Sequence, residues 1–282
     1  MQIRNYHRPS EPIKNLEAPE ACKEPCFFIG FEIEKRSFVN KWNDDIPNEI
    51  GEEVHDSSLF WKFETDSSCG VEAVTHVLPL GGVKSKERKF VFEEFDKEKT
   101  LINESPADYT CGGHITVSCN IKGYRTGINL ADKIKHNLAI FYAMFRRRLR
   151  HSYCSQNTLI LLGQNDRHSP VNIKHHAVEI RLPNAVRNVE QLKNRYDILF
   201  KLLKYSITEP ISWRQFKQEI QPNLMKMYNR DADKVNEVLS YADSFRHYLI
   251  VRDMKSDIAP FFTDTERSRW NSRYNEENIE YR

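Results

Sequence analysis

Three short segments far apart in the chain alternate apolar residues with charged or polar ones. They are residues 31–34 (Phe-Glu-Ile-Glu), 113–118 (Gly-His-Ile-Thr-Val-Ser) and 178–182 (Val-Glu-Ile-Arg-Leu). Side chains two positions apart in a β-strand point to the same side of the sheet. Each segment therefore predicts a strand that buries one apolar face and presents one polar face.

The polar positions of these strands carry carboxylates, one imidazole and one guanidinium. They are Glu32, Glu34, His114, Glu179 and Arg181. A turn-rich run at 65–70 leads into a fourth strand at 71–74, which places a further carboxylate, Glu72, among small apolar neighbours. Such groups are typical of a cleft that holds divalent metal ions and phosphate.

The remaining apolar positions predict a mixture of further strands and helices. Strand patterns occur at 27–35, 59–64 and 71–77, and the last one is interrupted by Pro and Gly at 79–82. Residues 84–99 predict a charged helix or helical hairpin, and 129–150 predict the longest helix because apolar residues recur at helical spacing. Further amphipathic helices are expected at 189–205 and, as two or three helices, within 208–257.

The order of these elements indicates four regions. Residues 1–25 carry four prolines among charges and are expected to form an N-terminal surface leader. Residues 26–205 hold all the polar strands and form the predicted catalytic core. A helical extension follows at 206–262, and the polar tail at 263–282 has little apolar surface to bury, so we expect it to be frayed or disordered.

Composition adds mainly exclusions. The 282 residues are 39% hydrophobic and 29% charged, as in ordinary globular proteins, and the net charge of +2 gives no general attraction to nucleic acid or acidic membranes. No apolar run approaches the length of a membrane span, and the N-terminus lacks the apolar core of a signal peptide. We therefore expect a cytoplasmic protein whose six cysteines are reduced.

Taken in order, residues 30–34, 66–72, 111–117 and 178–182 resemble the signature series of the amidoligase family. These carboxylate-amine ligases are similar in fold to glutamine synthetase and glutamate-cysteine ligase. The resemblance covers residues 26–205 and rests on the order and spacing of the motifs rather than on any one of them. It implies an α+β fold in which a curved antiparallel sheet forms a funnel-shaped active site with helices packed outside.

The resemblance also implies a reaction and its cofactors. In such enzymes ATP phosphorylates a substrate carboxylate, and an amine then attacks the acyl phosphate to form an amide or isopeptide bond. Two Mg²⁺ or Mn²⁺ ions take part, and this sequence has residues that match the family's ligands at five positions: Glu32, Glu34, Glu72, His114 and Glu179. Glu32 and Glu34 would serve different ions, and His114 would lie beside the nucleotide phosphates.

Three further residues receive roles. Arg181 resembles the arginine that steadies the transferring phosphoryl group, as a planar guanidinium can. Asp66 is the candidate for binding the amine or accepting its proton. An arginine at the end of the long helix would bind the substrate carboxylate, and Arg150 is preferred because residues 150–153 resemble the family's motif there. Arg146, Arg147 and Arg148 remain open as alternatives.

Other interpretations of the same residues stay open. Glu179 and Arg181 also suit a structural ion pair on a sheet, and the arginine cluster at 146–150 suits a helix C-terminus. At the level of function, the alternatives are a metal-dependent phosphoesterase or nuclease and a catalytically inactive ligase-like scaffold. The substrates are expected to be a small-molecule or peptide carboxylate and an amine, with no nucleic-acid or membrane partner. A compact ligase of this kind suits a bacterium or bacteriophage.

Overall fold

The computed structural model describes residues 3–5, 26–38, 57–66, 69–150, 162–164 and 169–251. The chain divides into two compact units, the first made of Met1–Asn120 with Ala185–Phe200 and the second of Ile121–Asn184 with Lys201–Arg282. Apart from residues 3–5, the expected leader and tail lie outside the described residues. The predicted domain boundary at residue 205 stays a prediction.

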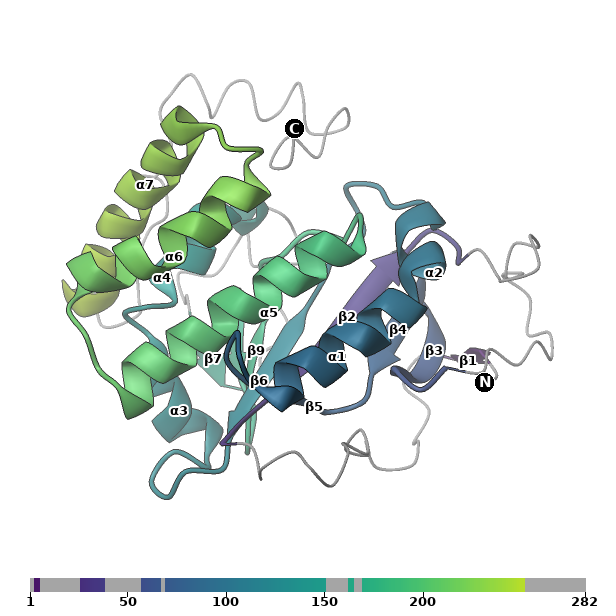
Figure 1. Cartoon of the computed structure of the whole chain (residues 1–282), viewed down its shortest axis with the longest axis horizontal. Helices are drawn as coiled ribbons and strands as arrows, with labels where there is room; N and C mark the ends of the chain where they lie inside the picture. The colour runs from purple at the N-terminus through teal and green to yellow at the C-terminus, as the bar shows by residue number, and fades with distance from the viewer. Residues whose placement is uncertain are drawn as a thin grey trace. The chain divides into compact units, whose positions relative to one another are not determined.

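The first unit is built on a sheet with β2 (Phe27–Lys35) inside it (Figure 1). Strand β2 pairs antiparallel with β4 (Gly70–Thr75), β5 (Leu78–Leu80) and β6 (Ile115–Cys119). Beyond β4 lies β3 (Phe60–Asp66), antiparallel to it, and then β1 (Ile3–Asn5), parallel to β3. The predicted strand 27–35 is confirmed.

Two expectations about these strands need correction. The parallel pairing of β1 with β3 departs from the purely antiparallel sheet that we expected. The Pro-Gly run at 79–82 was predicted to end strand structure, whereas Pro79 lies within β5, opposite Phe28 of β2. Proline is compatible with a strand where its missing N–H is not needed by the ladder, as at the short outer strand β5.

Helices of the first unit cover the apolar face of its sheet. They are α1 (Lys86–Lys97), α2 (Lys99–Glu104) and residues 189–200 of α5 (Val189–Leu203). Phe31 of β2 packs edge-on against Phe95 of α1, with ring centroids 5.8 Å apart, and the Tyr196 hydroxyl of α5 donates to Pro79 O. With one face of the sheet covered by apolar packing, the opposite face is left for polar chemistry.

The second unit combines short strands with several helices. Strand β8 (Val171–Ile173) pairs parallel with β7 (Leu162–Gln164) and antiparallel with β9 (Val178–Ile180). Its helices are α3 (Gly127–Ile134), α4 (Ala139–Met144), the 3-10 helix η1 (Arg146–Arg150), the π-helix η3 (Lys204–Thr208), α6 (Trp213–Met227) and α7 (Ala232–Val251). The helices predicted at 189–205 and within 208–257 are confirmed.

The single long helix predicted at 129–150 is wrong. The segment forms α3, a turn at 135–138, α4 and η1. Around the turn several amide donors bond three residues back rather than four, and the Asn137 side chain donates to Ser206 Oγ at 2.8 Å. Every residue of α4 is buried, so this stretch is a core segment, and its apolar positions do not report one continuous amphipathic face.

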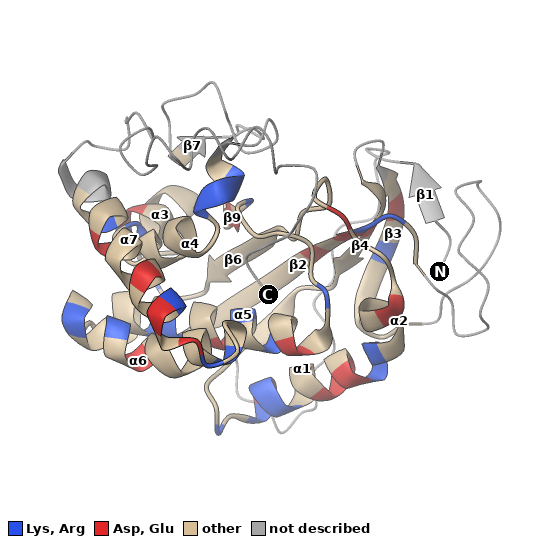
Figure 2. Cartoon of the chain, turned by 90° about the horizontal axis from the view of Figure 1, so that it is seen from above, with Lys and Arg blue, Asp and Glu red and all other residues tan. Residues whose placement is uncertain are grey.

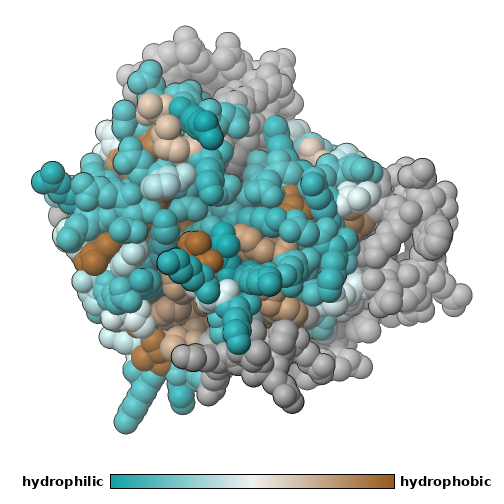
Figure 3. All heavy atoms as spheres, viewed as in Figure 1, coloured by the Kyte–Doolittle hydropathy of each residue, from teal (hydrophilic) through white to brown (hydrophobic). Residues whose placement is uncertain are grey.

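The exterior carries few large apolar side chains. The face seen in Figure 3 is mostly hydrophilic, with apolar residues in small groups. Within the described part of the chain, the large hydrophobic residues that are exposed are Val83 and Ile128. No helix among the described residues is long and apolar enough to cross a membrane.

Candidate functional site

The polar face of the first unit's sheet brings together residues from two sequence motifs. Backbone pairing continues beyond the end of β6, because Glu32 N donates to His114 O at 3.0 Å and Glu34 N donates to Gly112 O at 3.3 Å. The segment 112–114 therefore runs alongside the C-terminal half of β2. This pairing is what places the imidazole of His114 next to the two glutamates.

His114 lies between the two carboxylates of β2. Its Nδ1 is 2.8 Å from Glu32 Oε2, and its Nε2 is 3.5 Å from Glu34 Oε1. Glu34 and His114 are buried, whereas Glu32 is partly exposed. The predicted sharing of one strand face by Glu32 and Glu34 is thus confirmed, and both carboxylates contact the same imidazole.

Gly112 shapes the site from its backbone. Its N–H donates to Glu34 Oε2 at 2.5 Å, which holds that carboxylate against the strand. A Cβ atom at this position would lie 3.0 Å from both Glu34 Oε1 and His114 Nε2. Only glycine leaves these two ligand-type atoms undisturbed, so Gly112 has a steric role in the site.

A row of buried carboxylates crosses three neighbouring strands. Glu34 of β2 is the register partner of Glu72 of β4, and Glu72 is the partner of Glu64 of β3. Their exposed fractions are 5%, 6% and 4%. Lys62 Nζ pairs with Glu64 Oε1 at 2.5 Å and offsets part of the negative charge. In Figure 2 the acidic residues of these strands appear in red.

Sequence reasoning did not identify Glu64 or Lys62. The signal was present, because Lys62 and Glu64 flank the buried Phe63 and so share the other face of the strand predicted at 59–64. What the sequence did not provide was the register that sets Glu64 opposite Glu72. Glu72 itself is placed as predicted, on a strand of the same sheet.

The predicted residues Glu179 and Arg181 lie in the second unit. Glu179 of β9 is almost completely buried, and Arg181 Nη1 donates to its Oε1 at 3.1 Å. The other oxygen, Oε2, accepts from Asn172 Nδ2 at 2.9 Å and lies 3.2 Å from Lys174 Nζ. The predicted common face of Glu179 and Arg181 is confirmed. Asn172 and Lys174 are additional neighbours that sequence reasoning missed.

The two remaining predicted residues are placed by their backbone alone. Asp66 ends β3, opposite Gly70 of β4, and Arg150 ends η1. The side chains of both fall outside the part of the chain that is described. Their predicted roles in binding the amine and the carboxylate stay predictions.

Burial shifts the pKa values of two groups near the site in opposite directions. Desolvation raises the pKa of the Cys111 thiol to about 11, so this residue, next to Gly112, remains a protonated thiol. On the covered side of the sheet, burial lowers the pKa of Lys35 to about 8, and its Nζ donates to Ile102 O and Ser105 O at the end of α2. Cys111 is thus a protonated thiol when no metal is bound, and Lys35 supports the scaffold.

The donors on the polar face fit a hard divalent cation. Glu32, Glu34, Glu72 and Glu64 offer carboxylate oxygens, and His114 offers its Nε2, 3.5 Å from Glu34 Oε1. Carboxylates with a single imidazole suit Mg²⁺ and Mn²⁺, and like charges placed opposite each other across a sheet favour a bound cation. A carboxylate bonded to the second ring nitrogen also orients a metal-binding histidine, as Glu32 does here.

Comparison with known proteins gives limited similarity. No protein-family model matches the sequence, and no curated protein matches it either. Among solved structures, the chain is similar to one described as "Apo GmaS without ligand". That match covers 90% of this chain and 70% of the other, with 11% identity and a TM-score of 0.32. The mixed α/β fold with its antiparallel sheet rests on the chain's own strand pairings.

Proposed function

We propose that this protein is an ATP-dependent carboxylate-amine ligase that uses Mg²⁺ or Mn²⁺. The observation that carries the proposal is the convergence of Glu32, Glu34, Glu72 and His114 on one polar sheet face. These residues come from three of the ordered sequence motifs that resemble the amidoligases.

In this proposal the metal ligands are Glu32, Glu34, Glu72 and His114, and Glu179 completes the set. Bound metal ions would neutralise charge on the phosphate oxygens of ATP. The chain's own contribution is to hold the ligands in place: Gly112 N–H fixes Glu34, and Glu32 fixes the ring of His114. The inclusion of Glu179 rests on the sequence motif.

The proposed reaction has two steps. An oxygen of the substrate carboxylate attacks the γ-phosphorus of ATP, the bond to the bridging oxygen breaks, and ADP leaves. The nitrogen of an amine then attacks the acyl carbon, phosphate leaves with the C–O bond electrons, and the nitrogen loses a proton. Arg181 would stabilise the transferring phosphoryl group, Asp66 would take the proton and Arg150 would bind the carboxylate substrate.

The proposed substrates are a small-molecule or peptide carboxylate and an amine, and the proposed location is the cytoplasm. The two other interpretations predict different behaviour. A metal-dependent phosphoesterase or nuclease would need metal but no ATP, and a scaffold that has lost catalysis would turn over neither.

Calorimetric titration of ATP, with and without Mg²⁺, tests the proposal. We expect Mg²⁺-dependent binding that is lost in Glu32→Gln and His114→Ala and retained in the control Glu93→Gln, whose carboxylate is exposed on α1. Binding would justify a screen of amines with phosphate release as the readout. Absence of ATP binding in both conditions, or full binding by Glu32→Gln, would contradict the assignment.

A further inference from the structure

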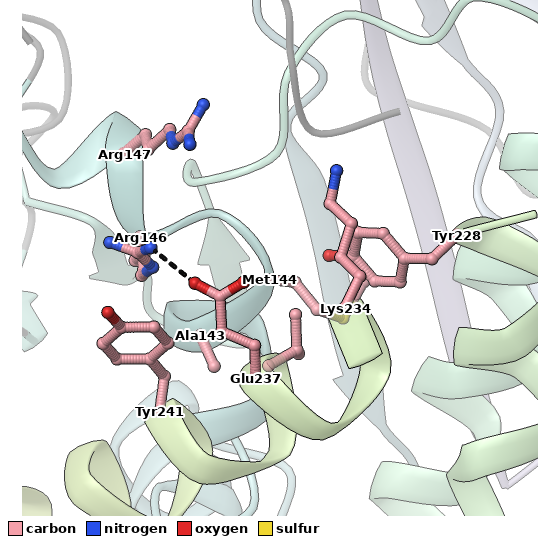
Figure 4. A pocket seen from close by; sticks show the side chains of 9 residues that line it. Ala143, Met144, Arg146, Arg147, Tyr228, Lys234, Glu237 and Tyr241 are labelled. Carbon is pink, nitrogen blue, oxygen red and sulfur yellow. Dashed lines mark hydrogen bonds and ion pairs between the residues drawn. The ribbon is translucent and has the colours of Figure 1, made fainter. Parts of the chain in front are cut away.

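A pocket within the second unit is lined by residues from two parts of the sequence. Ala143 to Arg147, at the end of α4 and the start of η1, supply one side, and the chain from Tyr228 into α7 supplies the other. The hollow between these residues spans about 380 Å³, of which a large part is open to solvent. Figure 4 shows Arg146, Arg147, Lys234, Glu237, Tyr228 and Tyr241 around it.

The lining is rich in positive charge. Arg146, Arg147 and Lys234 bring three cations and Glu237 brings one carboxylate, which leaves a net charge of +2. Two tyrosines add hydroxyl groups that can donate hydrogen bonds. A small hollow with this lining matches an anionic group that carries about two charges and several acceptor oxygens.

Arg146 is held in place by its neighbours. It is buried, its Nη2 donates to Glu237 Oε1 at 3.1 Å, and its guanidinium carbon lies 3.9 Å from the centroid of the Tyr241 ring. Figure 4 draws this ion pair as a dashed line. A guanidinium fixed by stacking and pairing is pre-organised, so it loses little freedom when a ligand binds.

The other two cations have different surroundings. Arg147 is half-buried, and the described part of the chain gives it no hydrogen bond or ion pair. Lys234 Nζ lies 5.4 Å from the centroid of the Tyr228 ring. Arg147 can therefore turn toward a ligand while Arg146 keeps its position.

We propose that this pocket binds a phosphate group, either free inorganic phosphate or the phosphate of a small monoester. At neutral pH such a group carries about −1.5 to −2 charges, close to the charge of the lining, and it accepts hydrogen bonds in the forked geometry of guanidinium. Glu237, which is paired with Arg146, disfavours long polyanions such as nucleic acid. The site needs none of the proposed metal ligands, and it gives a role of their own to Arg146 and Arg147, which the sequence left as alternatives to Arg150.

Calorimetry with inorganic phosphate and glycerol 3-phosphate, in the absence of divalent metal, tests this site in the full chain. Arg147→Gln and Lys234→Gln should each weaken binding about tenfold, as expected for loss of one charge-assisted hydrogen bond. Arg214→Gln and Lys226→Gln, which remove exposed cations of α6, are the matched controls and should bind normally. Circular dichroism checks that each variant is folded.

A gain-of-affinity variant gives a second test. Glu237→Gln removes the one carboxylate of the lining and should tighten phosphate binding several-fold, which a damaged fold would not do. Tighter binding of the monoester would assign a phosphorylated small molecule, and equal binding would assign free phosphate. Absence of millimolar binding, equal binding of succinate, or no effect of Arg147→Gln and Lys234→Gln would overturn the proposal. Glu32→Gln should leave phosphate binding unchanged, which separates this test from that of the ligase.

Discussion

Glu34 and Glu72 lie directly opposite each other on the antiparallel strands β2 and β4, and both are buried. Like charges in this position destabilise a sheet by up to about 1 kcal/mol per pair. Glu64 extends the row on β3 and is paired with Lys62. A cation bound on this face would offset the repulsion between these carboxylates.

Mn²⁺ or Mg²⁺ is therefore expected to raise the melting temperature. Saturating metal at about a hundred times its dissociation constant would add about 2.7 kcal/mol to the free energy of unfolding. Glu72→Gln should raise the melting temperature of the metal-free protein, because a like charge is removed, and should abolish most of the metal-induced increase. Differential scanning calorimetry with Glu93→Gln as the control measures both. An unchanged metal response in Glu72→Gln would argue against Glu72 as a ligand.

Gly112→Ala is expected to weaken metal binding while the fold is retained. The added Cβ would lie 3.0 Å from both Glu34 Oε1 and His114 Nε2, so these side chains must move apart by a few tenths of an ångström. Mn²⁺ titration followed by electron paramagnetic resonance should show at least about a tenfold loss of affinity. Gly30→Ala on β2 is the control, since its Cβ would meet only Thr75 Oγ1 at 3.9 Å. Equal affinities in the two variants would refute the steric role of Gly112.

Lys35 should make stability depend on pH in the alkaline range. Its pKa is about 8 in the folded protein and 10.5 in the unfolded chain, so between these values the unfolded state binds more protons. The free energy of unfolding should therefore rise as pH increases from about 8 to 10.5, by about 3 kcal/mol at most. Below pH 8 this contribution is absent.

Comparing the wild type with Lys35→Met isolates this effect from other titrating groups such as Cys111. Urea unfolding at several pH values should show the wild type gaining stability relative to the variant as pH rises. Lys89→Met, which removes an exposed lysine of α1, should follow the wild type. Parallel curves for the wild type and Lys35→Met would show that Lys35 is not desolvated in the folded state.

Arg88→Lys is expected to reduce stability by about 1 kcal/mol. Arg88 of α1 makes two hydrogen bonds to Asp197 of α5, at 2.7 and 2.9 Å, and its guanidinium lies 3.9 Å from the centroid of the Phe92 ring. Lysine can neither form the two parallel bonds nor stack in the same way. A double-mutant cycle with Asp197→Asn, measured by urea unfolding, gives the coupling energy of the pair. A coupling energy near zero would show that stacking on Phe92 dominates.

Several elements could be predicted because their signals are local. The alternation of residues 27–35 fixes both the strand and the common face of Glu32 and Glu34, since the side-chain period of a strand is two. The same holds for Glu179 and Arg181. The prediction of one helix at 129–150 was wrong because the segment is interrupted at 135–138, and its second half, α4, is buried on all sides rather than amphipathic.

The sequence by itself determined which residues carry the candidate chemistry and which of them share a strand face. Only the tertiary structure decided that His114 lies between Glu32 and Glu34, that the Gly112 N–H donates to Glu34, and that Glu64 is the register partner of Glu72. It also showed Arg146 stacked and paired with residues of α7. The physical reason is that strand register and helix packing join residues far apart in the chain, so they depend on the energy of the whole core rather than on any local pattern.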